Sequence, residues 1–81
     1  MAPEEMLRKA AREFLKGTPP YPDQSRRAKW GRYAIDLTDC AVRAADQNRP
    51  EFLRRKYLEA GTAILKRMKA IKAKAEEENQ T

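Results

Sequence analysis

Histidine is absent from this 81-residue chain, and cysteine occurs once, as Cys40. Histidine is the side chain that most readily exchanges a proton near neutral pH, and it is also the commonest metal ligand. One cysteine cannot form a disulfide within the chain. These absences argue against an acid–base enzyme, a common zinc site and a disulfide-stabilised fold, and they favour a reducing, cytoplasmic location.

Long apolar runs are also absent. No stretch approaches the roughly 20 apolar residues that a helix needs to cross a bilayer, and the first five residues are acidic where a signal peptide would be basic. We therefore expect a soluble protein with no membrane partner. A chain of this length forms one domain, and because such a small core rarely supplies more than about 3–5 kcal/mol, we expect self-association to support it.

Positive charge is abundant. The chain has 18 lysine and arginine residues against 12 aspartate and glutamate residues, which gives a formal net charge of +6. A net charge of this sign predicts attraction to polyanions, although it says nothing about the fold. Nucleic acid is the first expected partner, and an anionic membrane surface is a weaker alternative.

The clearest helical pattern lies in residues 50–75. Apolar or small residues recur there at alternating intervals of four and three, which places them on one side of an α-helix: Tyr57, Gly61, Ile64, Met68, Ile71 and Ala75. Pro50 suits the first helical position, where no N–H bond is lost. The acidic residues that follow Ala75 oppose the helix dipole, so residues 76–81 are predicted to fray.

Two further helices are predicted upstream. Residues 23–46, capped by Asp23 or Ser25, carry a second stripe of one buried face: Trp30, Tyr33, Ala34, Leu37, Ala41 and Ala44. Residues 3–16 form a shorter helix that begins at Pro3, and the proline-rich residues 17–22 form a stiff connector. The polar turn before Pro50 has the length that joins antiparallel helices, and the resulting hairpin would place Trp30 near Arg67.

The predicted fold is therefore all-α: an antiparallel helical hairpin with a short N-terminal helix. Leu37 and Ile64 are expected in its core. A second apolar row on each hairpin helix has no obvious cover within so short a chain, and exposed apolar rows usually mark interfaces. We expect oligomerisation to complete the bundle through this row, which consists of Ile35, Val42, Leu58 and Leu65.

No catalytic, metal or cofactor site is predicted. Cys40 falls at the edge of a buried stripe, where a small core residue is the simpler interpretation. Asp36 and Asp39 lie three residues apart and could share a divalent ion, but one such pair supplies too few oxygen ligands. They also stand at i,i+4 spacing to Arg32 and Arg43, which is typical of ion pairs on a solvated helix face.

The basic residues indicate a binding surface. In an antiparallel hairpin the start of residues 23–46 and the end of residues 50–75 meet, and this brings together Arg26, Arg27, Lys29, Arg32, Lys66, Arg67, Lys69 and Lys72. Three of these cations lie in a first helical turn, which the dipole disfavours, and a phosphate partner would compensate. Such contacts bind the backbone without reading sequence. Trp30 and Tyr33 could stack on bases, but their stripe positions favour the core.

The order from Tyr21 to Glu76 resembles the accessory variability determinant (Avd) proteins of diversity-generating retroelements and related four-helix-bundle proteins. The features that carry the resemblance are Pro22 with the basic residues 25–29, Leu37 and Val42 leading into residues 43–45, residues 52–58, and residues 64–68. The resemblance implies a basic helical bundle that forms a homo-oligomer, a pentamer in that family. It also implies association with a reverse transcriptase and with RNA and DNA during mutagenic cDNA synthesis.

Two functions follow from these patterns. The first is a nonenzymatic accessory protein that binds RNA or DNA and, by resemblance, a reverse transcriptase. The second is a structural adaptor whose helices bind another protein while its lysines maintain solubility. A helix lying on a membrane surface is less favoured, because the alanine-rich stripe interrupted by Gly61 suits helix packing better than lipid insertion.

Overall fold

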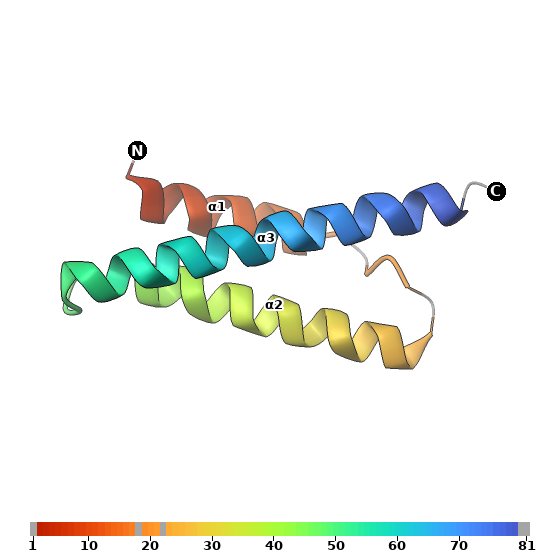
Figure 1. The fold of residues 1–81 in the computed structure, drawn as a ribbon, viewed down its shortest axis with the longest axis horizontal. Helices are drawn as coiled ribbons and strands as arrows, with labels where there is room; N and C mark the ends of the chain where they lie inside the picture. The colour runs from red at the N-terminus through yellow and green to blue at the C-terminus, as the bar shows by residue number, and fades with distance from the viewer. Residues whose placement is uncertain (1, 18, 22, 80–81) are drawn as a thin grey trace.

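The computed structural model describes residues 2–17, 19–21 and 23–79, with the side chain of residue 79 left out. These residues form three helices and no strand: α1 (Pro3–Leu15), α2 (Gln24–Ala45) and α3 (Glu51–Asn79). Figure 1 shows α2 and α3 as an antiparallel hairpin, with α1 beside it and running in the direction of α3. Helix α1 packs against both helices of the hairpin. The all-α hairpin with a short N-terminal helix is therefore confirmed.

Local contacts explain where the helices begin. The carboxylate of Asp23 accepts a hydrogen bond of 3.1 Å from the backbone N–H of Arg26, so Asp23, rather than Ser25, caps α2. Pro3 occupies the start of α1. The carbonyl of Pro50 accepts from the N–H groups of Leu53 and Arg54, and α3 begins at the next residue.

The core lies where all three helices meet. Leu37 of α2 and Met68 of α3 are fully buried, and the cluster around them contains Leu7, Ala11, Trp30, Ala41 and Leu65. The core position expected for Leu37 is confirmed. Ile64 is only partly buried and packs against this cluster, and Met68, one turn further along α3, occupies the centre instead.

The expected oligomer row divides into two pairs. Leu65 is only 7% exposed, and Leu58 is partly buried and packs against the same core, so the chain itself covers much of this pair. Helix α1 reaches this side of α3, where the side chain of Leu7 lies against Gly61. Ile35 and Val42 of α2 are 69% and 54% exposed and remain uncovered within the chain.

The end of α3 also differs from the expectation. Residues 76–78, which were expected to fray, are helical here, because α3 continues to Asn79. The dipole penalty amounts to a few tenths of a kcal/mol for an exposed charge, and glutamate is otherwise a good helix former. Buried Ala75 also anchors this last part of the helix. Residues 80–81 of the tail, and residues 18 and 22 of the connector, lie outside the described residues.

None of the three helices, as far as the chain is described, is long and apolar enough to span a membrane.

Candidate nucleic-acid interface

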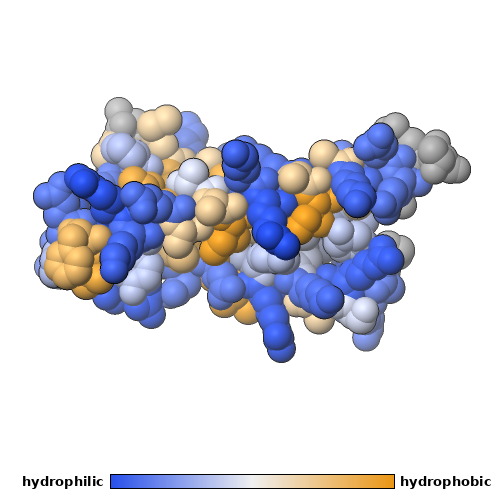
Figure 2. Space-filling view, in the orientation of Figure 1, coloured by the Kyte–Doolittle hydropathy of each residue, from blue (hydrophilic) through white to orange (hydrophobic). Residues whose placement is uncertain are grey.

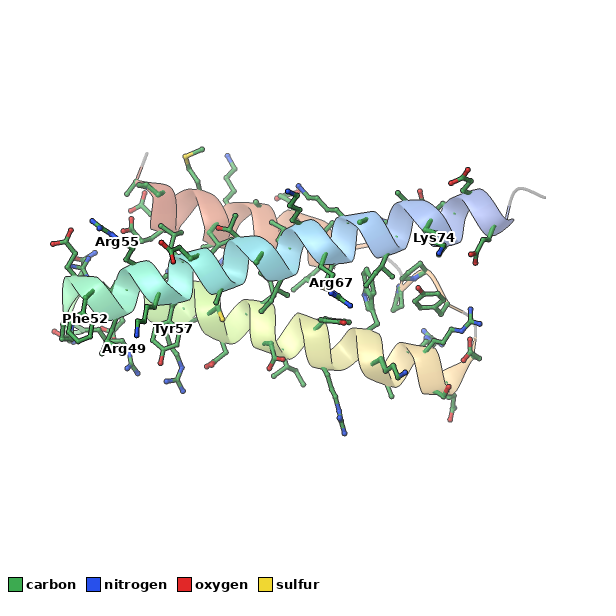
Figure 3. All side chains as sticks on the ribbon, viewed as in Figure 1. Arg49, Phe52, Arg55, Tyr57, Arg67 and Lys74 are labelled. Atoms are coloured by element: carbon green, nitrogen blue, oxygen red, sulfur yellow. The ribbon has the colours of Figure 1, made fainter. Side chains whose placement is uncertain are left out.

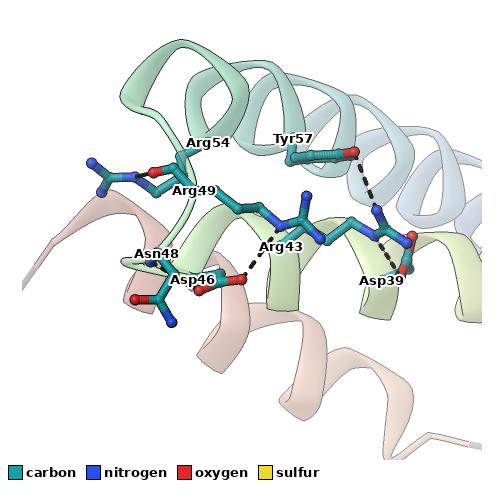
Figure 4. A network of polar contacts seen from close by, with 7 residues as sticks. All are labelled: Asp39, Arg43, Asp46, Asn48, Arg49, Arg54 and Tyr57. Atoms are coloured by element: carbon teal, nitrogen blue, oxygen red, sulfur yellow. Dashed lines mark hydrogen bonds and ion pairs between the residues drawn. The ribbon is translucent and has the colours of Figure 1, made fainter.

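We call the end of the hairpin where α2 leads into α3 the turn end. Polar contacts fix the side chains of two arginines there. Arg43 donates from Nε to Asp39 Oδ1 at 2.9 Å and from Nη1 to Tyr57 Oη at 3.3 Å. The hydrogen bond to the Asp39 carboxylate is the main cause of a raised Arg43 pKa. Arg49 Nε, itself a buried atom, lies 3.4 Å from Asp46 Oδ2 in a partly exposed ion pair (Figure 4). Both guanidinium groups lie over the ring of Tyr57, at 5.5 and 5.7 Å from its centroid.

Other arginines at the turn end are also engaged. Arg54 Nε donates to the carbonyl of Arg49 at 3.1 Å, and Arg55 pairs with Glu51 at 3.4 Å. Hydrophilic side chains cover most of the face drawn in Figure 2, and an apolar patch stands out at this end, where Figure 3 places Phe52. Phe52 is 63% exposed. The turn end therefore combines three arginines paired with carboxylates, Arg43, Arg49 and Arg55, with one exposed aromatic ring.

The opposite end, here called the basic end, is formed by the start of α2 and the second half of α3. It contains the eight predicted cations Arg26, Arg27, Lys29, Arg32, Lys66, Arg67, Lys69 and Lys72. Among the described residues, only Arg26 of this set has an ion pair, with Asp23 at 3.8 Å. The expected pair between Arg32 and Asp36 is not formed within the 4 Å limit of an ion pair, whereas that between Asp39 and Arg43 is. Positive charge at the basic end is thus largely uncompensated by direct contacts.

These cations surround the basic end and do not form one flat patch. Successive residues of a helix are separated by about 100°, so Arg67 and Lys69 project about 200° apart, as do Arg27 and Lys29. Arg67 points toward α2 (Figure 3), and its Nε donates to Tyr33 Oη at 3.2 Å. Arg67 thus meets Tyr33, about one turn further along α2 than Trp30, the neighbour expected from the sequence.

Two other features reduce the positive charge that the basic end presents to solvent. Lys72 is half-buried, and its Nζ lies 5.4 Å from the centroid of the Phe14 ring, so part of its charge is directed onto α1. Because α3 continues to Asn79, three helical glutamates (residues 76–78) also lie at this end. They lower its net positive charge, which the sequence interpretation left out of account.

An aromatic cleft opens between the connector, α2 and α3 at the basic end. It has a volume of about 250 Å³ and is lined by Tyr21, Arg26, Lys29, Trp30, Tyr33 and Ile71. The ring of Tyr21 meets Trp30 edge-on at 6.5 Å, and the guanidinium group of Arg26 lies 5.3 Å from the Tyr21 centroid. A second hollow of about 240 Å³ shares Lys29 and Tyr33 with the cleft and adds Arg32 and Asp36.

Sequence reasoning found only part of this cleft. Trp30 is 7% exposed, so its core assignment is confirmed, yet it also lines the cleft. Tyr21 was interpreted only as part of a stiff connector, and Ile71 only as a stripe residue. The signal that could have drawn attention to the cleft is the mixture of aromatic and basic residues from Tyr21 to Tyr33, a pattern common in single-strand binding.

The other candidate residues, Cys40, Asp36 and Asp39, lie in surroundings that favour a structural role. Cys40 is half-buried beside Gly61, and its pKa is raised by burial and by the nearby carboxylates of Asp39 and Asp36, which disfavours a reactive thiolate. In the part of the chain that the structure describes, no group of three or more acidic or thiol side chains is placed to hold a metal ion. Asp39 is engaged by Arg43.

The exposed apolar pair of α2 lies in a groove. Ile35 and Val42 line a hollow of about 460 Å³ on the outer face of α2, together with Ala34, Thr38 and Asp39. Thr38 and Val42 also line a hollow of about 330 Å³ between α1 and α2. The two hollows form one groove along α2, on a different side of this helix from the aromatic cleft.

Comparison with known proteins gives no match to a family model, to a curated protein or to a solved structure.

Proposed function

We propose that this protein is a nonenzymatic nucleic-acid-binding protein whose basic end contacts the phosphate backbone of RNA or DNA. The observation that supports this most is the difference between the two ends of the hairpin. At the turn end Arg43, Arg49 and Arg55 each have a carboxylate partner. At the basic end seven of the eight cations have none among the described residues. Uncompensated cations that encircle one end suit a flexible polyanion.

The contacts expected at the basic end carry no sequence information. Lysine and arginine contacts to phosphate fix position and contribute affinity, while base edges carry the sequence. Exposed Arg27, Lys66 and Lys69 suit phosphate contacts on different sides of the hairpin. Binding of this kind releases counterions, so affinity falls with salt concentration, with a logarithmic slope of about −0.7 to −0.9 per phosphate neutralised.

The resemblance to Avd proteins extends this proposal. We propose that the chain acts in the cytoplasm as an accessory to a reverse transcriptase of a diversity-generating retroelement. The small all-helical fold and the uncompensated basic end are consistent with that role. The polymerase partner rests on the resemblance alone, and a pull-down with the reverse transcriptase encoded nearest to this gene tests it directly.

Charge reversal tests the location of nucleic-acid binding. The triple change Arg26→Glu, Arg27→Glu and Lys69→Glu should weaken binding of unrelated RNA and DNA sequences similarly and reduce the salt slope. The matched control is Arg8→Glu, Lys9→Glu and Lys56→Glu, which alters net charge equally. These three residues are exposed, lie outside the basic end and have no ion pair within the described chain. Arg43, Arg49 and Arg54 are unsuitable controls because they hold the turn.

The results separate the two candidate functions. Loss of affinity in the basic-end variant alone, with unchanged helical signal, supports the proposal. Equal losses in both variants would mean that net charge, and not the basic end, determines affinity. Absence of binding by the parent protein at low salt would leave the adaptor function.

A structural adaptor is the second candidate function, and the exposed groove of α2 is the observation that favours it. Ile35 and Val42 lie seven residues apart, on one helix face, and both are more than half exposed. We propose that a second copy of the chain covers this groove and completes the bundle, as one contact of a larger ring such as the pentamer of the Avd family. Self-association is compatible with both functions.

A further inference from the structure

The aromatic cleft at the basic end combines cations with aromatic rings, and binding to the phosphate backbone does not require the rings. Its walls include the half-buried rings of Tyr21 and Tyr33 together with Trp30, and its rim includes Arg26 and Lys29. Lys29 has no carboxylate partner among the described residues, and the hydroxyl of Tyr33 accepts a hydrogen bond from Arg67. Phosphate contacts need only the cations, so the rings require another explanation.

The simplest alternative is that the rings only pack the core, and Trp30 does pack in this way. Its indole N–H, however, makes no hydrogen bond to any described residue, and this nitrogen is not among the described side-chain atoms that are both sealed from solvent and without a hydrogen bond. A tryptophan that is 7% exposed usually has a partner for this donor. The donor therefore keeps access to solvent, and Trp30 lines the cleft.

The size of the cleft limits what enters it. At about 250 Å³ it is smaller than the roughly 300–1,000 Å³ of pockets for drug-sized ligands, and it suits one planar ring system. The neighbouring hollow, lined by Lys29, Arg32, Tyr33 and Asp36, continues it along α2. Arg67 lines neither hollow, but its Nε donates to Tyr33 Oη, and Tyr33 lines both. One flat group in the cleft would thus lie near several cations that could meet flanking phosphates.

Resting on the nucleic-acid-binding function proposed above, we propose that this cleft accepts an unpaired nucleobase, so that the basic end prefers single-stranded RNA or DNA to duplex. A base offers its face to an aromatic ring only when it is unstacked, and every base has such a face, so the preference is for strandedness and not for sequence. The arrangement of cations around the end, in place of one flat patch, also suits a flexible strand better than a rigid duplex.

Trp30 is the only tryptophan in the chain, so its fluorescence reports on this cleft directly. The parent protein is titrated at low salt with oligothymidylate, with a duplex containing the same number of phosphates, and with thymidine monophosphate. We expect oligothymidylate to quench Trp30 and to bind more tightly than the duplex. We expect the mononucleotide to bind far more weakly, because it lacks the flanking phosphates that Arg32 and Arg67 would meet.

Substitutions test the role of the ring. Tyr33→Ala should weaken oligothymidylate binding roughly 5-fold or more, the lower limit for loss of one base–aromatic stack, and leave duplex affinity little changed. Tyr33→Phe, which keeps the ring and loses the hydroxyl that accepts from Arg67, should retain most of the preference. Tyr33→Leu keeps apolar volume if the alanine variant folds poorly. Phe52→Ala removes an exposed ring at the turn end and is the matched control.

Each other outcome has a definite meaning. Equal affinity and equal quenching for single strand and duplex would overturn the cleft proposal while leaving backbone binding intact. Mononucleotide binding as tight as that of the oligomer would assign the cleft to free nucleotides instead. No binding of any probe at low salt would overturn the cleft proposal together with the proposed function.

Discussion

Gly61 of α3 lies directly against Cys40 of α2. A Cβ atom added at Gly61 would stand 3.1 Å from Cys40 Cβ, and it would also stand 2.8 Å from Leu7 Cδ2 of α1. All three helices therefore meet at a position where only a hydrogen atom fits. Glycine in a helix interior is unfavourable by itself, so its presence here reflects this close approach.

The first prediction concerns this contact. Gly61→Ala should lower the free energy of unfolding by about 1 kcal/mol, because overpacking costs roughly 1–3 kcal/mol and the better helix propensity of alanine returns up to about 1 kcal/mol. Gly31→Ala is the matched control, since no heavy atom lies within 4 Å of its added Cβ, and it should stabilise α2. Urea unfolding followed by circular dichroism measures both. A stabilising Gly61→Ala would show that Leu7 and Cys40 move aside easily.

The second prediction concerns the core. Leu37→Ala and Met68→Ala should each lower the free energy of unfolding by about 2–5 kcal/mol, through lost transfer energy and a residual cavity. In a domain this small, either change could abolish folding. Ile64→Ala should cost less, because Ile64 is only partly buried. Equal shifts in urea midpoint for Ile64→Ala and Met68→Ala would contradict the observed centre of the core.

The third prediction concerns pH and the cap of α2. The backbone N–H of Arg26 donates to the Asp23 carboxylate and lowers its pKa below the ordinary value of 3.8. Because the folded pKa is depressed, the stabilisation is fully present above pH 3.8 and is lost as the pH falls through the lower, folded value.

Asp23→Asn separates the cap from the charge. Asparagine caps helices about as well as aspartate does but does not titrate, so this variant should remain helical near neutral pH and lose the acid-dependent part of the change. Asp23→Ala should lower the helical signal at every pH. Identical acid titrations of the parent and Asp23→Asn, followed by circular dichroism, would mean that Asp23 does not contribute to acid sensitivity.

The fourth prediction concerns self-association. The parent should have a mass above that of the 9.4 kDa monomer by light scattering, with unfolding that depends on protein concentration. Replacing exposed Ile35 and Val42 by lysine should produce a monomer without unfolding it, whereas Leu65→Lys should disrupt the fold because Leu65 is buried by its own chain. A monomeric parent with concentration-independent unfolding would remove this interface.

Much of the fold could be predicted from the sequence because local rules determine it. Residue spacing predicted the three helices and their order, Asp23 was one of two caps considered, and the polar turn before Pro50 predicted the hairpin. Leu37 lies at the centre of its stripe and is fully buried. In these places helix periodicity, capping and turn length agree with the tertiary packing.

The rest depended on tertiary contacts. Periodicity shows that a helix has a second apolar face, but it cannot show what covers that face: Leu65 is buried in the core cluster that also contains Leu7 of α1, whereas Ile35 is 69% exposed. Spacing equally allowed Arg32–Asp36 and Asp39–Arg43 pairs, of which only the second formed, where Tyr57 of α3 gives Arg43 a further partner.

The candidate site also has one part that the sequence predicts and another that only the tertiary structure determines. The sequence by itself determined that cations gather where α2 begins and α3 ends, because the antiparallel hairpin requires it. Only the tertiary structure brought Tyr21 of the connector and Ile71 of α3 to the same cleft as Tyr33. Residues that far apart in the chain are brought together by the helix register and by the path of the connector, and side-chain packing between helices sets both.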